Sequence, residues 1–165
     1  MDENEFWSVV EGLAPENRTG DLKKRLSKLE PEKIVAFGRA FQLMAAKAYD
    51  WALFGALRLI HGGDCSEELF DRSCYGLVLR GRKVYESALA NPDSIAEWLK
   101  EEEQIADDDG TDTALEVYEA ITGAEFPTSE YPHMAPTGDE NLVEFAETWP
   151  KAFPRLHARF GALQT

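Results

Sequence analysis

The stretch that decides the fold is residues 31–63, which read PEKIVAFGRAFQLMAAKAYDWALFGALRLIHGG. Its apolar residues recur three and four positions apart, which is the spacing of one face of an α-helix. They are Ile34, Phe37, Phe41, Met44, Ala45 and Ala48, followed by Trp51, Leu53, Phe54, Leu57 and Ile60. Asp50 predicts an N-cap between two helices. Gly62 and Gly63 predict the end of the second helix, because glycine enters the left-handed conformation at little cost.

The helical period continues on both sides of this stretch. Further helices are predicted on Phe6–Leu13, Leu22–Leu29, Ser66–Ala88, Ser94–Glu102, Thr113–Thr122, Asn141–Trp149 and Pro154–Phe160. The Ser66–Ala88 helix contains Gly76 and Gly81, and Ser94 with Glu97 predicts a capping box. No alternating strand is present. We therefore predict an all-α fold, a single-domain compact helical bundle of about six to eight helices over residues 1–165, whose core includes Phe37, Phe41, Trp51, Leu57, Phe70 and Leu77.

Charge divides the chain into three blocks, although the total is 17 Lys and Arg against 31 Asp and Glu, a net charge of −14. Residues 1–100 are a near-neutral core half, residues 101–150 hold 15 acidic and no basic side chains, and residues 151–165 form a short basic C-terminal helix. Such a net charge argues against direct binding to nucleic acid or to a membrane surface, since both are anionic. The acidic segment is either a solubilising face or a surface for a basic protein partner. Its candidate partner-binding residues are Glu101, Glu102, Glu103, Asp107, Asp108 and Asp109.

The termini and the cysteines indicate the compartment. The chain starts Met-Asp-Glu-Asn-Glu and has no basic start with an apolar run behind it, so no secretory signal is expected and the predicted location is cytoplasmic. If Cys74 lies on the helix that begins at Ser66, it is ~13 Å from Cys65 at the rise of an α-helix. A disulfide needs Cα atoms within ~7 Å, so both thiols are expected to be reduced.

No catalytic or cofactor motif is found. Gly62-Gly63 lacks the third glycine of a dinucleotide loop, and the run from Asp107 to Asp112 lacks EF-hand spacing, so an inter-helix loop is expected there. We therefore predict no cofactor, no metal and no catalytic residue.

The turn from His61 to Ser66 holds the one cluster of soft and titratable groups, with His61, Asp64 and Cys65 as candidate ligand- or partner-binding residues. A purely structural turn is the alternative. The helix dipole at Ser66 would lower the pKa of Cys65, whereas Asp64 and the two glutamates that follow Ser66 would raise it. Trp51 is a further candidate, as a core anchor or a surface on which a ligand stacks. Arg80 is another, in a basic cluster with Arg72, Arg82 and Lys83. Arg80 is also of a type that pairs with carboxylates across a bundle.

Several short motifs resemble one bacterial family, called "domain of unknown function 4240". They are Met1–Trp7, Tyr49–Phe54, His61–Gly63, Cys65-Ser66, Phe70-Asp71, Leu79–Arg82 and Ala90–Ser94. The resemblance covers about Met1–Leu99, with a looser match through the helix at Tyr118. It differs from the family pattern at His61, where members tend to have Asn, and at Asp64, which stands between the glycine pair and Cys65. The resemblance implies an all-α cytosolic bacterial domain and no established activity.

Two functions are compatible with these observations. One is a non-catalytic protein-interaction module, an inhibitor or immunity-type partner of a basic protein, including a nucleic-acid-binding one whose phosphate site the acidic surface imitates. The other is a small-ligand-binding protein or enzyme that uses the His61–Ser66 turn and the Arg80 helix. A deep pocket flanked by Trp51, His61 and Arg80 would favour the second function, and a convex acidic face without a pocket would favour the first.

Overall fold

The structure is a computed structural model that describes residues 1–100, 103–127 and 134–164. All regular elements in these residues are helical: eleven α-helices and three short 3-10 helices. The all-α prediction is confirmed. The described residues form more helices than the predicted six to eight, partly because two of the predicted helices are divided. One pair of backbone hydrogen bonds joins Thr137 to Tyr49 and Trp51, which is an isolated bridge rather than a strand.

The α-helices are α1 (Glu3–Val10), α2 (Arg18–Leu26), α3 (Pro31–Lys47), α4 (Trp51–Ile60), α5 (Glu67–Leu79), α6 (Arg82–Ala90), α7 (Ile95–Trp98), α8 (Gly110–Thr122), α9 (Asn141–Glu144), α10 (Trp149–Ala152) and α11 (Pro154–Phe160). The 3-10 helices are η1 (Pro92–Ser94), η2 (Ala146–Thr148) and η3 (Gly161–Gln164).

Local sequence determines where several helices begin and end. Asp2 and Glu5 form a reciprocal capping box on α1, and Asp50 accepts hydrogen bonds from the second and third N–H groups of α4. The Ser66 hydroxyl accepts from the third N–H group of α5. After α4, Gly62 and Gly63 have φ of 75° and 97°, in the left-handed region. The predicted caps at Asp50 and Ser66 and the predicted glycine stop are therefore confirmed.

The helix predicted from Ser66 to Ala88 is wrong, because Gly81 breaks it into α5 and α6. Gly81 has φ of 91°, and a Cβ at this position would lie 2.8 Å from a carboxylate oxygen of Glu11. That carboxylate accepts from the backbone N–H of Arg82, at 2.8 Å, at the start of α6. A change of chain direction and the close approach of Glu11 thus require glycine here.

Three other predicted boundaries are also corrected. Ser94 caps no helix, since its hydroxyl donates to the Ser87 carbonyl, and α7 ends at Trp98. The segment Asn141–Trp149 is divided into α9, η2 and the start of α10. Pro150 lies in the first turn of α10, where a backbone N–H group would have no partner within the helix, so proline is tolerated there. The helix α8 begins at Gly110 rather than at Thr113, and it ends at Thr122 as predicted.

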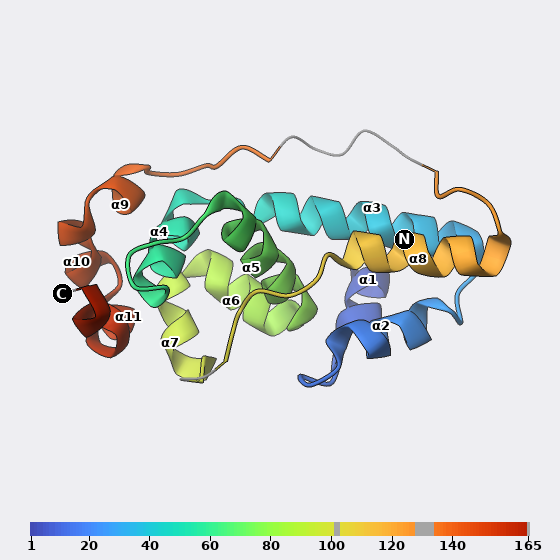
Figure 1. Cartoon of the computed structure of the whole chain (residues 1–165), viewed down its shortest axis with the longest axis horizontal. Helices are drawn as coiled ribbons and strands as arrows, with labels where there is room; N and C mark the ends of the chain where they lie inside the picture. Colours follow the sequence, from blue (N-terminus) through green and yellow to red (C-terminus); the bar gives the residue numbers. More distant parts are fainter. Residues whose placement is uncertain (101–102, 128–133, 165) are drawn as a thin grey trace.

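The helices form an elongated arrangement (Figure 1). At one end α3 and α8 run side by side, with α1 and α2 against them, and at the other end α9, α10 and α11 gather around α4. Between these ends lie α5, α6 and α7. One hydrophobic cluster extends through all of these regions. This arrangement brings residues from distant parts of the sequence to the surface of α5.

The predicted core is confirmed except at one residue. The fully buried members are Phe37, Phe41, Leu57, Phe70 and Leu77. Trp51 is instead half-buried, at the first position of α4, with its ring stacked 6.0 Å from that of Phe54. The buried face of α4 is formed by its smaller apolar residues, Leu53, Ala56, Leu57 and Leu59. Among the described residues, no helix is long and apolar enough to cross a membrane.

Candidate functional site

The acidic segment meets the core half of the chain along α5. The N–H of Asp107 donates to the Arg72 carbonyl at 3.0 Å, and the Ile105 carbonyl faces Gly76. A Cβ on Gly76 would lie only 1.6 Å from that carbonyl oxygen. Glycine is therefore required inside α5, because residues 103–109 pass directly over it.

Arg80, at the end of α5, fixes this passage. Its side chain is 4% exposed, and it donates to the carbonyls of Gly76, Gln104 and Ile105 at 2.7–3.0 Å. It also donates to the Glu103 carboxylate at 3.0 Å. The expectation that Arg80 pairs with a carboxylate is thus confirmed. Four of its five N–H groups are used within the chain.

A second arginine lies beside this pair. The side chain of Arg18, from the start of α2, is 11% exposed. Its closest contacts are the Pro15 carbonyl at 3.4 Å, Asp107 at 3.5 Å and the Glu103 oxygen that Arg80 uses at 3.8 Å. These distances exceed the ~2.7–2.9 Å of a close charge-assisted hydrogen bond. Burial, followed by the charge of Arg18, lowers the pKa of Arg80.

The two arginines line a cavity of about 270 Å³, here called the arginine cavity. Its polar lining is Arg18, Arg80, Lys100 and Glu103, and Trp98 is part of its apolar lining. The Arg80 guanidinium carbon lies 5.4 Å from the centre of the Trp98 ring, a cation–π contact. Of these residues, Arg80 and Glu103 were predicted site candidates. Arg18, Trp98 and Lys100 were not, since nothing in a single sequence indicates that positions 18, 80 and 98 are neighbours.

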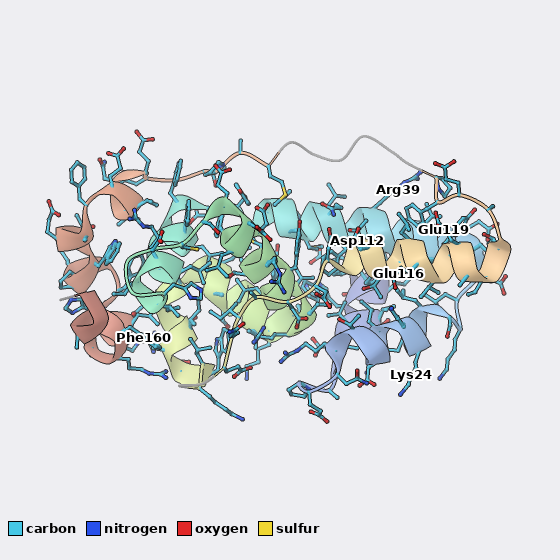
Figure 2. The ribbon with its side chains drawn as sticks, viewed as in Figure 1. Lys24, Arg39, Asp112, Glu116, Glu119 and Phe160 are labelled. Atoms are coloured by element: carbon cyan, nitrogen blue, oxygen red, sulfur yellow. The ribbon has the colours of Figure 1, made fainter. Side chains whose placement is uncertain are left out.

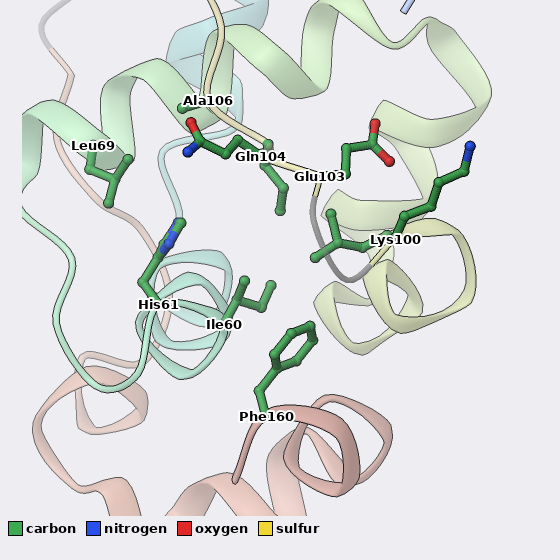
Figure 3. A pocket seen from close by; sticks show the side chains of 10 residues that line it. Ile60, His61, Leu69, Lys100, Glu103, Gln104, Ala106 and Phe160 are labelled. Carbon is green, nitrogen blue, oxygen red and sulfur yellow. The ribbon is translucent and has the colours of Figure 1, made fainter. Parts of the chain in front are cut away.

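His61 borders a different cavity, of about 360 Å³ (Figure 3). Ile60 and His61 from the end of α4 lie on one side of it, Lys100 and Glu103 on the other, and Phe160 of α11 at its base in this view. Lys100 and Glu103 line both cavities. A deep pocket flanked by Trp51, His61 and Arg80 would have favoured the small-ligand function, but in the described residues His61 and Arg80 border separate cavities and Trp51 lines neither.

The turn after α4 is tied down by Arg58. The Arg58 side chain donates twice to the Gly63 carbonyl, and the Gly63 N–H donates to the Arg58 carbonyl at 2.7 Å. Asp64 is exposed. The ring of His61 is half-buried, its Nε2 has no hydrogen-bond partner among the described residues, and burial lowers its pKa. Burial thus favours the neutral form of the His61 ring.

Cys65 is not activated in this structure. Its side chain is buried, and burial, followed by the charge of Asp64, raises the pKa of Cys65 to about 11. The thiolate is the nucleophilic form of cysteine, so little of it is present at neutral pH. Cys65 and Cys74 are both free and buried, which confirms that the two thiols are not joined.

The candidate carboxylates near position 105 mostly serve contacts within the chain. Glu103 and Asp107 contact arginines, as described above, and Asp108 lies 3.9 Å from Arg72. Asp109 is the N-cap of α8 and also accepts from Gln42 at 3.0 Å, and its pKa is raised by burial. Glu101 and Glu102 lie outside the described residues.

The exposed acidic residues of α8 are interspersed with basic ones. Asp112, Glu116 and Glu119 follow one another along the helix, and Figure 2 shows Arg39 and Lys24 on either side of this row. Glu116 also pairs with Lys23 of α2. This surface is therefore of mixed charge.

Residues 139–147 carry a second group of exposed acidic side chains. Asp139, Glu140, Glu144 and Glu147 are all exposed, and none forms an ion pair with the part of the chain that the structure describes. Phe145, between them, is 44% exposed. We call these five residues the Phe145 patch. No group of three or more His, Cys, Asp or Glu in the described ranges is placed to hold a metal ion.

The fold and these sites define an all-helical protein with two adjoining cavities. Part of its acidic segment contacts arginines of the core half, and part is exposed to solvent. The chain belongs to the family described as "Protein of unknown function (DUF4240)", whose model matches residues 1–127. The match confirms the resemblance found in the sequence and extends through α8. No curated protein and no solved structure matches the chain. The arginine cavity lies within the matched residues, whereas the Phe145 patch follows them.

Proposed function

We propose that this protein is a non-catalytic interaction module that meets a basic protein through the Phe145 patch. The observation that carries the proposal is the state of the four carboxylates of the patch, which are exposed and without an ion pair among the described residues. Like charges held together oppose compaction of the chain. The repulsion between these carboxylates has a functional explanation if they attract a partner protein of opposite charge.

Phe145 supports the same proposal. A phenylalanine ring that is 44% exposed leaves apolar area in water, and aromatic residues are enriched at the centre of protein interfaces. An exposed ring with carboxylates on both sides of it in the sequence fits a partner surface with Lys or Arg around an apolar hollow. A nucleic-acid-binding protein has such a basic surface, and occupation of its phosphate sites would make this chain an inhibitor or immunity-type partner.

The test is association kinetics with a partner captured from the native host by pull-down. Reversal of three patch charges, Glu140→Lys, Glu144→Lys and Glu147→Lys, is expected to lower the on-rate about tenfold or more at low salt, since steering governs association. The matched control makes the same change in charge on α8, Asp112→Lys, Glu116→Lys and Glu119→Lys, and is expected to have a smaller effect.

Phe145→Ala separates contact from steering. It is expected to raise the off-rate and to leave the on-rate nearly unchanged, because it removes buried area and no charge. An on-rate that is independent of salt and unchanged by the patch reversal would overturn the proposal.

Small-ligand binding is the second candidate function, and the arginine cavity is the observation that favours it.

A further inference from the structure

Three buried N–H donors around the arginine cavity have no acceptor among the described residues. They are Nε of Arg18, Nε of Arg80 and the indole Nε1 of Trp98. All three residues line the arginine cavity. Buried donors in proteins are nearly always paired, and three that border one cavity are unusual.

The charge of the lining has the same sign as these donors. Arg18, Arg80 and Lys100 are cationic, and among the residues that the structure describes Glu103 is the one acidic residue that lines this cavity. A single oxygen of Glu103 serves both arginines, at 3.0 Å from Arg80 and 3.8 Å from Arg18. Asp107 offers Arg18 a further contact, at 3.5 Å, and does not line the cavity. The described lining of the cavity therefore has two more positive than negative side chains.

The two arginines differ in how firmly they are held. The guanidinium of Arg80 donates to three backbone carbonyls and one carboxylate and is fixed in place. With the part of the chain that the structure describes, the guanidinium of Arg18 makes contacts of 3.4 Å or longer only. Arg80 thus supplies a fixed part of the site, whereas Arg18 retains donors for a ligand.

We propose that the arginine cavity binds the anionic group of a small molecule, a carboxylate or a phosphate, through Arg18, Arg80, Lys100 and the indole N–H of Trp98. Such a group only accepts hydrogen bonds, and the unpaired groups here only donate them. The apolar lining from Leu13, Val84 and Trp98 suits a small apolar body attached to the anion. This proposal does not depend on the Phe145 patch, which lies on different elements.

The test observes the donors themselves. Nuclear magnetic resonance of ¹⁵N-labelled protein detects the arginine Nε–H and tryptophan indole N–H signals, which Arg18→Gln and Trp98→Phe assign to Arg18 and Trp98. Inorganic phosphate and benzoate are titrated separately, with sodium chloride keeping the ionic strength constant. Saturable shifts of the Arg18 and Trp98 signals are expected with at least one of the two anions. A response to phosphate alone identifies a phosphate site, and a response to benzoate alone identifies a carboxylate site.

Arg18→Gln removes one charge from the site and is expected to weaken binding tenfold or more, as followed by the Trp98 signal. The matched control is Arg39→Gln, the same change at an exposed arginine of α3, which is expected to bind as the wild type does. Absence of saturable shifts with both anions, or equal binding by Arg18→Gln and wild type, would overturn the proposal. Reversal of the Phe145 patch charges is expected to leave the titration unchanged, so this proposal and the proposed function can fail separately.

Discussion

Residues 103–109 and residues 139–147 belong to one acidic stretch of the sequence, but the structure uses them in opposite ways. In the first region the carboxylates of Glu103, Asp107 and Asp109 accept hydrogen bonds or ion pairs from side chains of the core half. In the second region the carboxylates remain exposed. The number of acidic residues in a segment therefore does not indicate whether they form internal contacts or face solvent. That outcome depends on the hydrogen-bond donors that folding places beside them.

The donors explain the difference. Residues 103–109 lie along α5, where Arg18, Arg72 and Arg80 offer guanidinium groups. Residues 139–147 pack near α4, where Arg58 donates to the carbonyls of Gly63 and Val143. The guanidinium of Arg58 thus donates to backbone groups, and the carboxylates of Asp139, Glu140, Glu144 and Glu147 are exposed to solvent.

The largest expected effect concerns the passage of residues 103–109 over α5. Gly76→Ala is expected to destabilise the fold by ~3 kcal/mol or more, because its Cβ would overlap the Ile105 carbonyl. The control is Gly123→Ala, where the added methyl group meets no atom within 4 Å and strain at a φ of 67° costs ~1–2 kcal/mol. Urea denaturation measures both. Equal losses for the two variants would mean that the segment does not pack on α5 as described.

The second prediction compares one carboxylate from each region. Glu103→Gln is expected to lower the free energy of unfolding by ~2–3 kcal/mol, because it leaves the buried charge of Arg80 without its carboxylate. This loss is smaller than for a fully buried ion pair, since the Glu103 side chain is 26% exposed. Glu147→Gln, on the Phe145 patch, is expected to change stability by less than ~0.5 kcal/mol. Chemical denaturation of both variants at pH 7 checks this. A similar effect of the two changes would remove the distinction between the regions.

The third prediction uses pH. Burial raises the pKa of Asp109 above its ordinary value of 3.8, so the folded state binds the proton more tightly than the unfolded state does. The contribution of this group to stability is therefore full below pH 3.8 and is lost as the pH rises through the folded pKa. A tenfold difference in proton affinity corresponds to ~1.4 kcal/mol.

Asp109→Asn removes this titration while keeping an oxygen for the cap of α8. The stability of wild type relative to Asp109→Asn is expected to fall as the pH is raised from 3 to 7. Thermal denaturation across this range measures the difference. Parallel curves would show that the Asp109 carboxylate is not desolvated.

The smallest effect is expected between the two regions, on α8. Glu116 is exposed and pairs with the exposed Lys23, so Glu116→Gln is expected to cost only ~0.2–1 kcal/mol. The loss is expected to disappear in 1 M NaCl, where the Debye length is ~3 Å. A loss that persists at high salt would indicate that Glu116 acts through packing rather than charge.

Sequence alone determined the features that depend on neighbours a few residues apart. The apolar period predicted the helices, and Asp50, Ser66 and the glycine pair predicted three boundaries, because caps are satisfied by backbone groups within three residues. Of the candidate site residues, Arg80 and Glu103 were singled out and lie together in the structure. Their role as a pair was not predicted.

Tertiary structure decided what depends on contacts between distant residues. Gly81 became a helix break because Glu11 approaches it, and Trp51 lies at the edge of the core because smaller residues of α4 fill the interior. The arginine cavity joins Arg18, Arg80 and Trp98 from three parts of the chain. Local sequence does not encode which side chains the fold brings together or removes from water. Packing by distant residues buries the N–H donors around this cavity, and the same packing sets the charge of its lining.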